Sequence, residues 1–287
     1  MNYQTFEIEP LTALTAPHVI VGFRGWGNAL DVASGAAVYL VETLGGAAIG
    51  RIQPDACFRY DENRPVVHIS GGKLEAITPP RGVFYALPRP AGEGDLLILV
   101  ADEPQLNWYR FTRELVELST AIGAASLISL GSMFDSVLHT DHIISGIATG
   151  EPMREMLARH AVKPVDYHGP SAIHTLLLEA CRKRGIPGAS LWCHCPAYLQ
   201  GVIHHGMVLA LVRLLARILS VDLPTDGLET RWKALSIQIE KLAATNPKIG
   251  EIMDKIRREQ RTAEASPPQP GQGHTGTVIN LGDYLNE

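Results

Sequence analysis

Short apolar runs rich in β-branched residues alternate along the chain with longer segments of helical periodicity. Residues 18–23, 95–101 and 125–130 are runs of the first kind, and they predict strands that are buried on both faces. Helices are predicted at 28–44, 107–122, 171–184 and 202–220. This alternation is typical of one sheet covered by helices on both faces. We therefore expect the loops after Phe23, Ala101 and Leu130 to leave the sheet along the same rim.

A β-hairpin is predicted between the first and second of these buried strands. Residues 66–70 and 74–78 flank Gly71-Gly72-Lys73. Paired glycines supply the positive φ angles that tight hairpin turns need.

The composition changes after Pro224, where one apolar stripe appears at helical spacing. Asp226 and Glu229 are a plausible capping pair for the first helix, and Asn246-Pro247 provides a cap and a first-turn proline for a second. The stripe consists of Leu228, Trp232, Leu235, Ile239 and Leu242. We predict an α/β core domain at 1–222, a helical hairpin at 223–262 and a flexible tail at 263–287.

Composition and charge exclude several classes of function. Of the 287 residues, 46% are hydrophobic and 19% are charged, which is ordinary globular usage. The net charge of −5 is spread over interspersed acids and bases, so no basic face predicts nucleic-acid binding. The most apolar segment, 206–221, is interrupted by Arg213 and Arg217 and is not expected to span a membrane.

The amino terminus and the cysteines bear on the compartment. Residues 1–10 contain acids where a signal peptide needs a basic start and an apolar run. Four cysteines in a chain of this length do not make a disulfide framework. The sequence therefore favours the reducing cytoplasm.

The turn between the first strand and its helix is one candidate for ligand binding. Gly25-Trp26-Gly27 begins like a dinucleotide fingerprint, but Leu30 stands where the third glycine belongs. The alternative is a tight glycine turn in which Asn28 or Asp31 serves the first turn of the helix.

The ends of the next two strands add further candidates. Asp102 and Glu103 follow the central run, where ligands of open α/β sheets bind, although one of them could instead cap the next helix. Ser132 and Asp135 follow the run at 125–130. The candidate pocket therefore comprises Trp26, Asn28, Asp31, Asp102, Glu103, Ser132 and Asp135.

Two motifs suggest chemistry that their details do not support. Ser132 is followed by His139, Asp141 and His142, but Phe134 replaces the last glycine of a nucleophile elbow. Cys193-His194-Cys195 looks like a metal site. On a strand the two cysteines would have Cα atoms about 6.6 Å apart, with His194 on the other face, so buried apolar thiols are the better interpretation. We predict neither a metal nor a cofactor.

Several stretches together resemble the bacterial branch of the proteasome assembly chaperone family, second type. A Gly-Trp turn with a helix of small residues lies at 25–34, and a segment ending in Arg-Pro lies at 58–65. A pattern of Glu-Pro, Trp and Phe lies at 103–111. A Gly-Pro element lies at 167–171, and a Trp-x-x-x-Pro-x-Tyr element lies at 192–198. The resemblance extends over 19–257.

The resemblance implies a three-layer α/β/α sandwich, similar to the phosphorylase/hydrolase-like fold, that assembles into homo-oligomers. It also implies a protein-binding or assembly factor, since archaeal and eukaryotic relatives bind proteasome α-subunits and guide ring assembly. The alternative, from the polar residues at the strand ends, is a small-molecule hydrolase or phosphorylase-like enzyme. The expected partners are copies of the chain itself and another protein.

Overall fold

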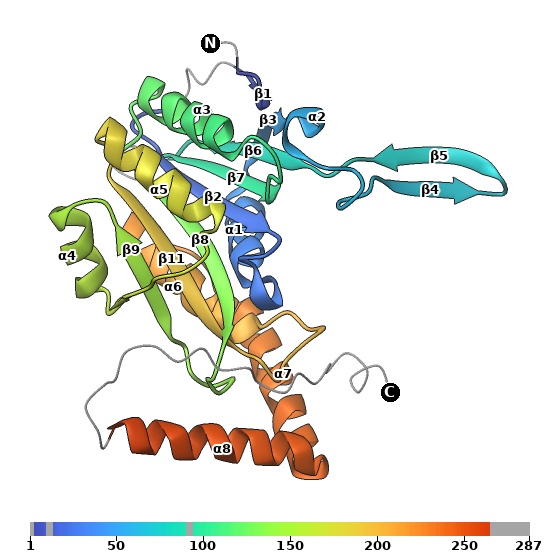
Figure 1. Cartoon of the computed structure of the whole chain (residues 1–287), viewed down its shortest axis with the longest axis vertical. Coiled ribbons are helices and arrows are strands. Elements are labelled where there is room, and N and C mark those ends of the chain that lie inside the picture. Colours follow the sequence, from blue (N-terminus) through green and yellow to red (C-terminus); the bar gives the residue numbers. More distant parts are fainter. Residues whose placement is uncertain (1–2, 10–13, 90–93, 265–287) are drawn as a thin grey trace.

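A mixed sheet forms the centre of the molecule (Figure 1). The computed structural model describes residues 3–9, 14–89 and 94–264. In this part of the chain the sheet has nine strands. In spatial order they are β1 (Phe6–Ile8), β3 (Ala47–Ile52), β6 (Gly82–Leu87), β7 (Leu96–Asp102), β2 (His18–Arg24), β8 (Ser126–Asp135), β11 (Gly188–Pro196), β9 (Ile144–Ala148) and β10 (Lys163–Pro164).

The four central strands β7, β2, β8 and β11 are mutually parallel. Val19 of β2 lies opposite Leu97 of β7 and Leu127 of β8, and all three side chains are buried. Because both faces of these strands are covered, their sequences are continuous apolar runs and do not alternate with polar residues. The strands predicted at 18–23, 95–101 and 125–130 are confirmed, and they end at the same edge.

Helices cover both faces of the sheet, so the predicted three-layer α/β/α sandwich is confirmed. Side chains of α1 (Val32–Leu44) and α6 (His205–Leu219) share one buried cluster with Ile20 and Ile98. Side chains of α3 (Trp108–Ala121) and α5 (Ile173–Arg184) share the other with Val21 and Leu99. Three short helices complete this part: η1 (Ala29–Asp31), α2 (Pro54–Cys57) and α4 (Glu151–Arg159).

The predicted C-terminal helical hairpin consists of α7 (Asp226–Thr245) and α8 (Pro247–Glu264). Leu228, Leu235 and Ile239 of the predicted stripe are buried in the same cluster as α1 and α6. The hairpin therefore docks on the body and shares its core. Asn246 accepts a hydrogen bond from the backbone N–H of Lys248 at 3.1 Å, as a cap for α8 should.

The predicted cap of α7 is wrong, and the helix predicted at 171–184 begins two residues later than expected. The residue before α7 is Thr225, whose hydroxyl donates to the Glu229 carboxylate at 2.8 Å, so Asp226 lies inside the helix. The residue before α5 is Ala172, and the hydroxyl of Ser171 donates to the carbonyl of Ala172 at 2.9 Å. Sequence patterns place the ends of a helix only to within one or two residues, which accounts for both differences.

The predicted β-hairpin is also present, as a separate two-stranded sheet of β4 (Val66–Ser70) and β5 (Lys73–Thr78). Gly71 and Gly72 have φ of +56° and +80°, as the turn requires. The hairpin projects away from the body (Figure 1).

Two predictions on domain organisation stay predictions. The division at residue 222 is one of them, and most of the tail predicted at 263–287 lies outside the described residues. In the part of the chain that the structure describes, no helix combines the length and apolarity that crossing a bilayer requires.

Candidate functional site

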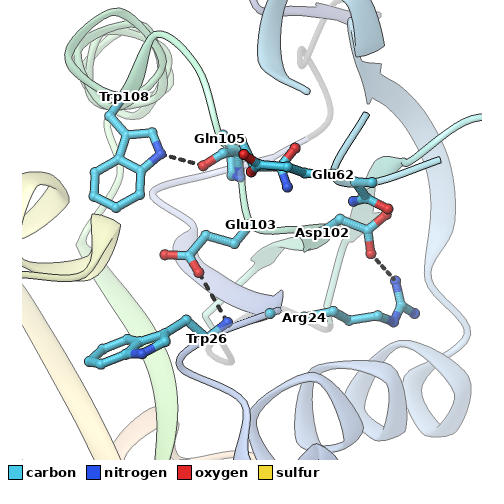
Figure 2. A pocket seen from close by; sticks show the side chains of 10 residues that line it. Arg24, Trp26, Glu62, Asp102, Glu103, Gln105 and Trp108 are labelled. Carbon is cyan, nitrogen blue, oxygen red and sulfur yellow. Dashed lines mark hydrogen bonds and ion pairs between the residues drawn. The ribbon is translucent and has the colours of Figure 1, made fainter. Parts of the chain in front are cut away.

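A pocket of about 440 Å³ lies at the ends of β2 and β7 (Figure 2). Both strands end at the same edge, so the residues that follow them are brought together. The pocket is lined by Arg24, Gly25, Trp26, Glu62, Asn63, Asp102, Glu103, Pro104, Gln105 and Trp108. Three of the seven predicted site residues, Trp26, Asp102 and Glu103, line it.

Asp102 joins three strands at the floor of this site. Arg24 lies directly opposite it in the β2–β7 register, and its guanidinium is 3.9 Å from the Asp102 carboxylate (Figure 2). The same carboxylate accepts a hydrogen bond at 2.8 Å from the backbone N–H of Arg81, one residue before β6. Asp102 thus fixes the rim of the sheet as well as lining the pocket.

Glu103 holds the turn that follows β2. Its carboxylate accepts a hydrogen bond from the backbone N–H of Trp26 at 3.2 Å, and its own N–H donates to the carbonyl of Arg24 at 2.7 Å. Burial raises the pKa of this carboxyl, while the backbone N–H groups of Ile173 and Trp26 lower it. Gly25 has φ +134°, and a Cβ there would lie 3.0 Å from the Cβ of Glu103, so this close approach needs a glycine.

Two tryptophans flank the pocket in different ways. The indole N–H of Trp108 donates to the carbonyl of Pro104, which fixes its ring at the start of α3. Trp26 is 68% exposed, although its backbone is anchored by Glu103. A fixed backbone with an exposed indole is an arrangement suited to contact with another molecule.

Asn28 and Asp31 organise the start of α1. The Asn28 amide donates to Asp31 at 3.0 Å and to the Ser34 hydroxyl at 2.9 Å, and its carbonyl accepts from the backbone N–H of Ser34 at 3.0 Å. Leu30 and Asp31 both have positive φ, 52° and 53°. These contacts match the structural alternative for this turn, in which polar side chains serve the first turn of the helix.

Ser132 lies inside β8, because this strand runs five residues beyond the predicted end at Leu130. Its hydroxyl is buried and donates to the carbonyl of Ala29 at 2.9 Å. Ser132 is therefore a link between β8 and η1. The triad considered with His139, Asp141 and His142 is not formed, since His139 contacts Tyr198 and Glu240 instead.

A different Ser-His-Asp chain is present on strands β8, β11 and β9. The Ser145 hydroxyl is 2.8 Å from Nε2 of His194, and Nδ1 of His194 is 2.7 Å from the Asp135 carboxylate. Sequence reasoning named Asp135 but missed its two partners. Only the spatial order β8-β11-β9 brings the three residues side by side.

Cys193 and Cys195 are buried. This agrees with the interpretation that they are apolar thiols in the core. Burial raises the pKa of Cys195 to about 12 and that of Cys193 well above its usual value, so both remain protonated thiols. Among the residues with described positions, no group of three or more His, Cys, Asp or Glu is arranged to hold a metal ion.

The family model described as the PAC2 family matches residues 19–243. The chain belongs to the PAC2 family. The resemblance seen in the sequence is thereby confirmed, and three of its five stretches, 25–34, 58–65 and 103–111, contribute residues to the pocket lining. A search of curated proteins finds no match.

Several solved structures are similar to this chain. A PAC2 family protein from Streptomyces avermitilis is 26% identical, with a TM-score of 0.72 over 82% of this chain and 99% of its own. A proteasome-assembly chaperone homologue from Mycobacterium tuberculosis is 25% identical, with a TM-score of 0.73 over the same shares. An archaeal proteasome activator from Pyrococcus furiosus is 17% identical, with a TM-score of 0.67 over 84% and 99%. This last likeness shows the fold alone.

Proposed function

We propose that this PAC2-family protein is an oligomeric, protein-binding assembly factor of the cytoplasm. Family membership and the likeness to a proteasome-assembly chaperone homologue support a chaperone-like role. The observation that carries the proposal for this chain is Trp26, a large apolar side chain that is 68% exposed at the mouth of a pocket. Exposed tryptophans of this kind are over-represented among the residues that dominate protein–protein affinity.

The turn that carries Trp26 is pre-organised for such a contact. Gly25 provides the required backbone conformation, and Glu103 holds the Trp26 N–H. Little backbone entropy is then lost when a partner covers the indole, which favours affinity. Arg24, Glu62 and Asp102 around the pocket would supply the polar rim of the interface.

A Trp26→Ala variant tests this function. Proteins that co-purify with the tagged chain from cells of its own host are identified, and the affinity for the purified partner is measured. Loss of a central tryptophan costs about 2 kcal/mol or more, so we expect a dissociation constant raised roughly 30-fold. Ile237→Ala, an exposed apolar residue on α7, is the matched control and should bind like the wild type.

Equal capture of that partner by Trp26→Ala and by the wild type would contradict the proposed binding site. Self-association is scored separately by sedimentation of the wild-type chain. A monomer throughout the micromolar range would contradict an oligomeric factor.

The chain Ser145–His194–Asp135 favours a second candidate, a hydrolase. In such a chain the serine oxygen attacks a carbonyl carbon and its proton passes to Nε2 of the imidazole, while the carboxylate orients the ring. The imidazole then gives this proton to the leaving group as the bond between that group and the carbonyl carbon breaks, which leaves the acyl group on the serine. Water later releases the acyl group. In a catalytic triad the aspartate is buried and the serine can reach the substrate. Here Ser145 is only 3% exposed, while the Asp135 side chain is 44% exposed. For this reason the hydrolase ranks second.

A fluorophosphonate probe tests the hydrolase directly. If Ser145 is a nucleophile, its peptide should gain the mass of the phosphonyl group, and Ser145→Ala and His194→Ala should abolish the labelling. Ser171→Ala serves as the control. An unlabelled Ser145 in the folded wild-type protein would exclude this candidate.

A further inference from the structure

The hairpin of β4 and β5 with its Gly71–Gly72 turn, which we call the arm, is exposed along its whole length. Every residue of both strands is exposed. The aliphatic side chains are more than half exposed, from 53% for Val67 to 71% for Val66. The arm stands clear of the body (Figure 1), so no other described element covers either of its faces.

The pairing of the two strands places four aliphatic side chains on one face. Val67 lies opposite Ile77, and Ile69 lies opposite Leu74, across a register shift between His68 and Ile69. Directly opposed residues share a face, and residues two apart on one strand share a face as well. Val67, Ile69, Leu74 and Ile77 therefore form one aliphatic face.

The opposite face of the arm is polar apart from Val66 and Ala76. It carries His68 and Thr78, which pair with Ala76 and Val66 respectively. A sheet with one apolar and one polar face normally packs its apolar face and keeps the other in water. A two-stranded hairpin in water is at best marginally stable alone, and a third strand or a packed face is needed. The aliphatic face is therefore the surface that a partner must cover.

We propose that the aliphatic face of the arm packs against the same face of a second copy of this chain. Two identical faces of branched aliphatic side chains are self-complementary, as a two-fold contact requires. The charged residues within the strands, Lys73 and Glu75, are 3.3 Å apart and neutralise each other near the tip. Two arms can thus meet without burying an unpaired charge.

The size of the arm sets the strength of this contact. Strands of five and six residues offer less than the roughly 1,200 Å² at which stable interfaces begin. We therefore expect a dimer that dissociates on dilution through the micromolar range. This inference rests on the self-association part of the proposed function and names the surface responsible.

The first test uses charges on one face or the other. The wild type, the double variant Ile69→Lys/Ile77→Lys and the control Ser70→Lys/Thr78→Lys are compared by sedimentation velocity over a range of concentrations. The wild type and the control should form dimers, and the aliphatic-face variant should remain a monomer with an unchanged melting temperature. Dimers of all three proteins would overturn the arm as the interface while leaving self-association intact.

The second test is cross-linking between copies. All four native cysteines are buried, so an Ile69→Cys variant has a single accessible thiol. Mild oxidation should give a disulfide-linked dimer, with at least tenfold less from His68→Cys on the opposite face. Equal yields from the two variants, a wild-type monomer, or cross-links of Ile69→Cys to a different protein alone would overturn the proposal. Partner binding through Trp26 is measured independently of all these outcomes.

Discussion

Gly22 lies where the central strand β2 passes beneath α1. A Cβ at this position would lie 2.6 Å from the Cβ of Ala37 and 3.1 Å from the carbonyl oxygen of Ala33. The helix is rich in small residues, and the absence of a side chain at Gly22 lets it approach the sheet closely.

Gly22→Ala should therefore destabilise the protein by roughly 1–3 kcal/mol, the usual range for overpacking a core. Gly227→Ala is the matched control, since a Cβ there meets nothing within 4 Å and alanine is the better helix former. Urea unfolding of both variants measures the difference. Equal midpoints would mean that α1 moves away from the sheet at little cost.

Residue roles were only partly predictable from the sequence. Trp26, Asp102 and Glu103 were found because parallel strands end at one edge, a rule that needs no coordinates. The role of Ser132 was not readable, because nothing in Gly131-Ser132-Met133 marks the continuation of β8 as far as Asp135. Ser145 and His194 were missed because their contact depends on the spatial order of strands that lie far apart in sequence.

Between elements, α7 is held to the body by histidines that surround Trp232. The ring of His204 stacks on Trp232 at 5.2 Å, and His139 and His142 contact the same indole edge-on. His139 also lies 3.2 Å from Glu240 of α7. Burial lowers the pKa of His204 to about 3, and it lowers those of His139 and His142. On the other face of the sheet it lowers the pKa of His174 to about 4.

These shifts predict that acid destabilises the fold well above the carboxylate range. Each lowered histidine binds a proton in the unfolded chain near pH 6.5 but not in the folded one. The contribution of these neutral histidines to the free energy of unfolding is therefore fully present above pH 6.5, and it is lost as the pH drops towards 4. His174 and His204 together should cost about 3 kcal/mol between pH 7.5 and 5.5, at about 1.4 kcal/mol per pH unit each.

Urea midpoints at the two pH values provide the measurement. His204→Asn keeps an N-cap acceptor for the N–H of Met207 and should remove about half of the pH dependence. His68→Asn, on the exposed arm, should leave it unchanged. A wild-type protein equally stable at both pH values would show that these histidines are protonated in the folded state.

For the whole molecule, the layered architecture was predictable while the placement of the appendages was not. Buried strands and amphipathic helices have distinct periodicities, so their alternation indicates an α/β/α sandwich directly. The stripe from Leu228 to Leu242 showed that α7 needs a partner, but periodicity cannot name the surface that receives it. The pattern at 66–78 predicted the hairpin, yet only coordinates show that it projects from the body.

The order of the sheet also dictates when a nascent chain can begin to fold. β2 is complete at Arg24, but its neighbours β7 and β8 end at Asp102 and Asp135. At translation rates of roughly 5–20 residues per second, the buried strand β2 leaves the ribosome several seconds before either of the strands that pair with it. During that interval the backbone N–H and C=O groups along both edges of β2 lack their native partners, so this strand is open to incorrect pairing while the chain is being made.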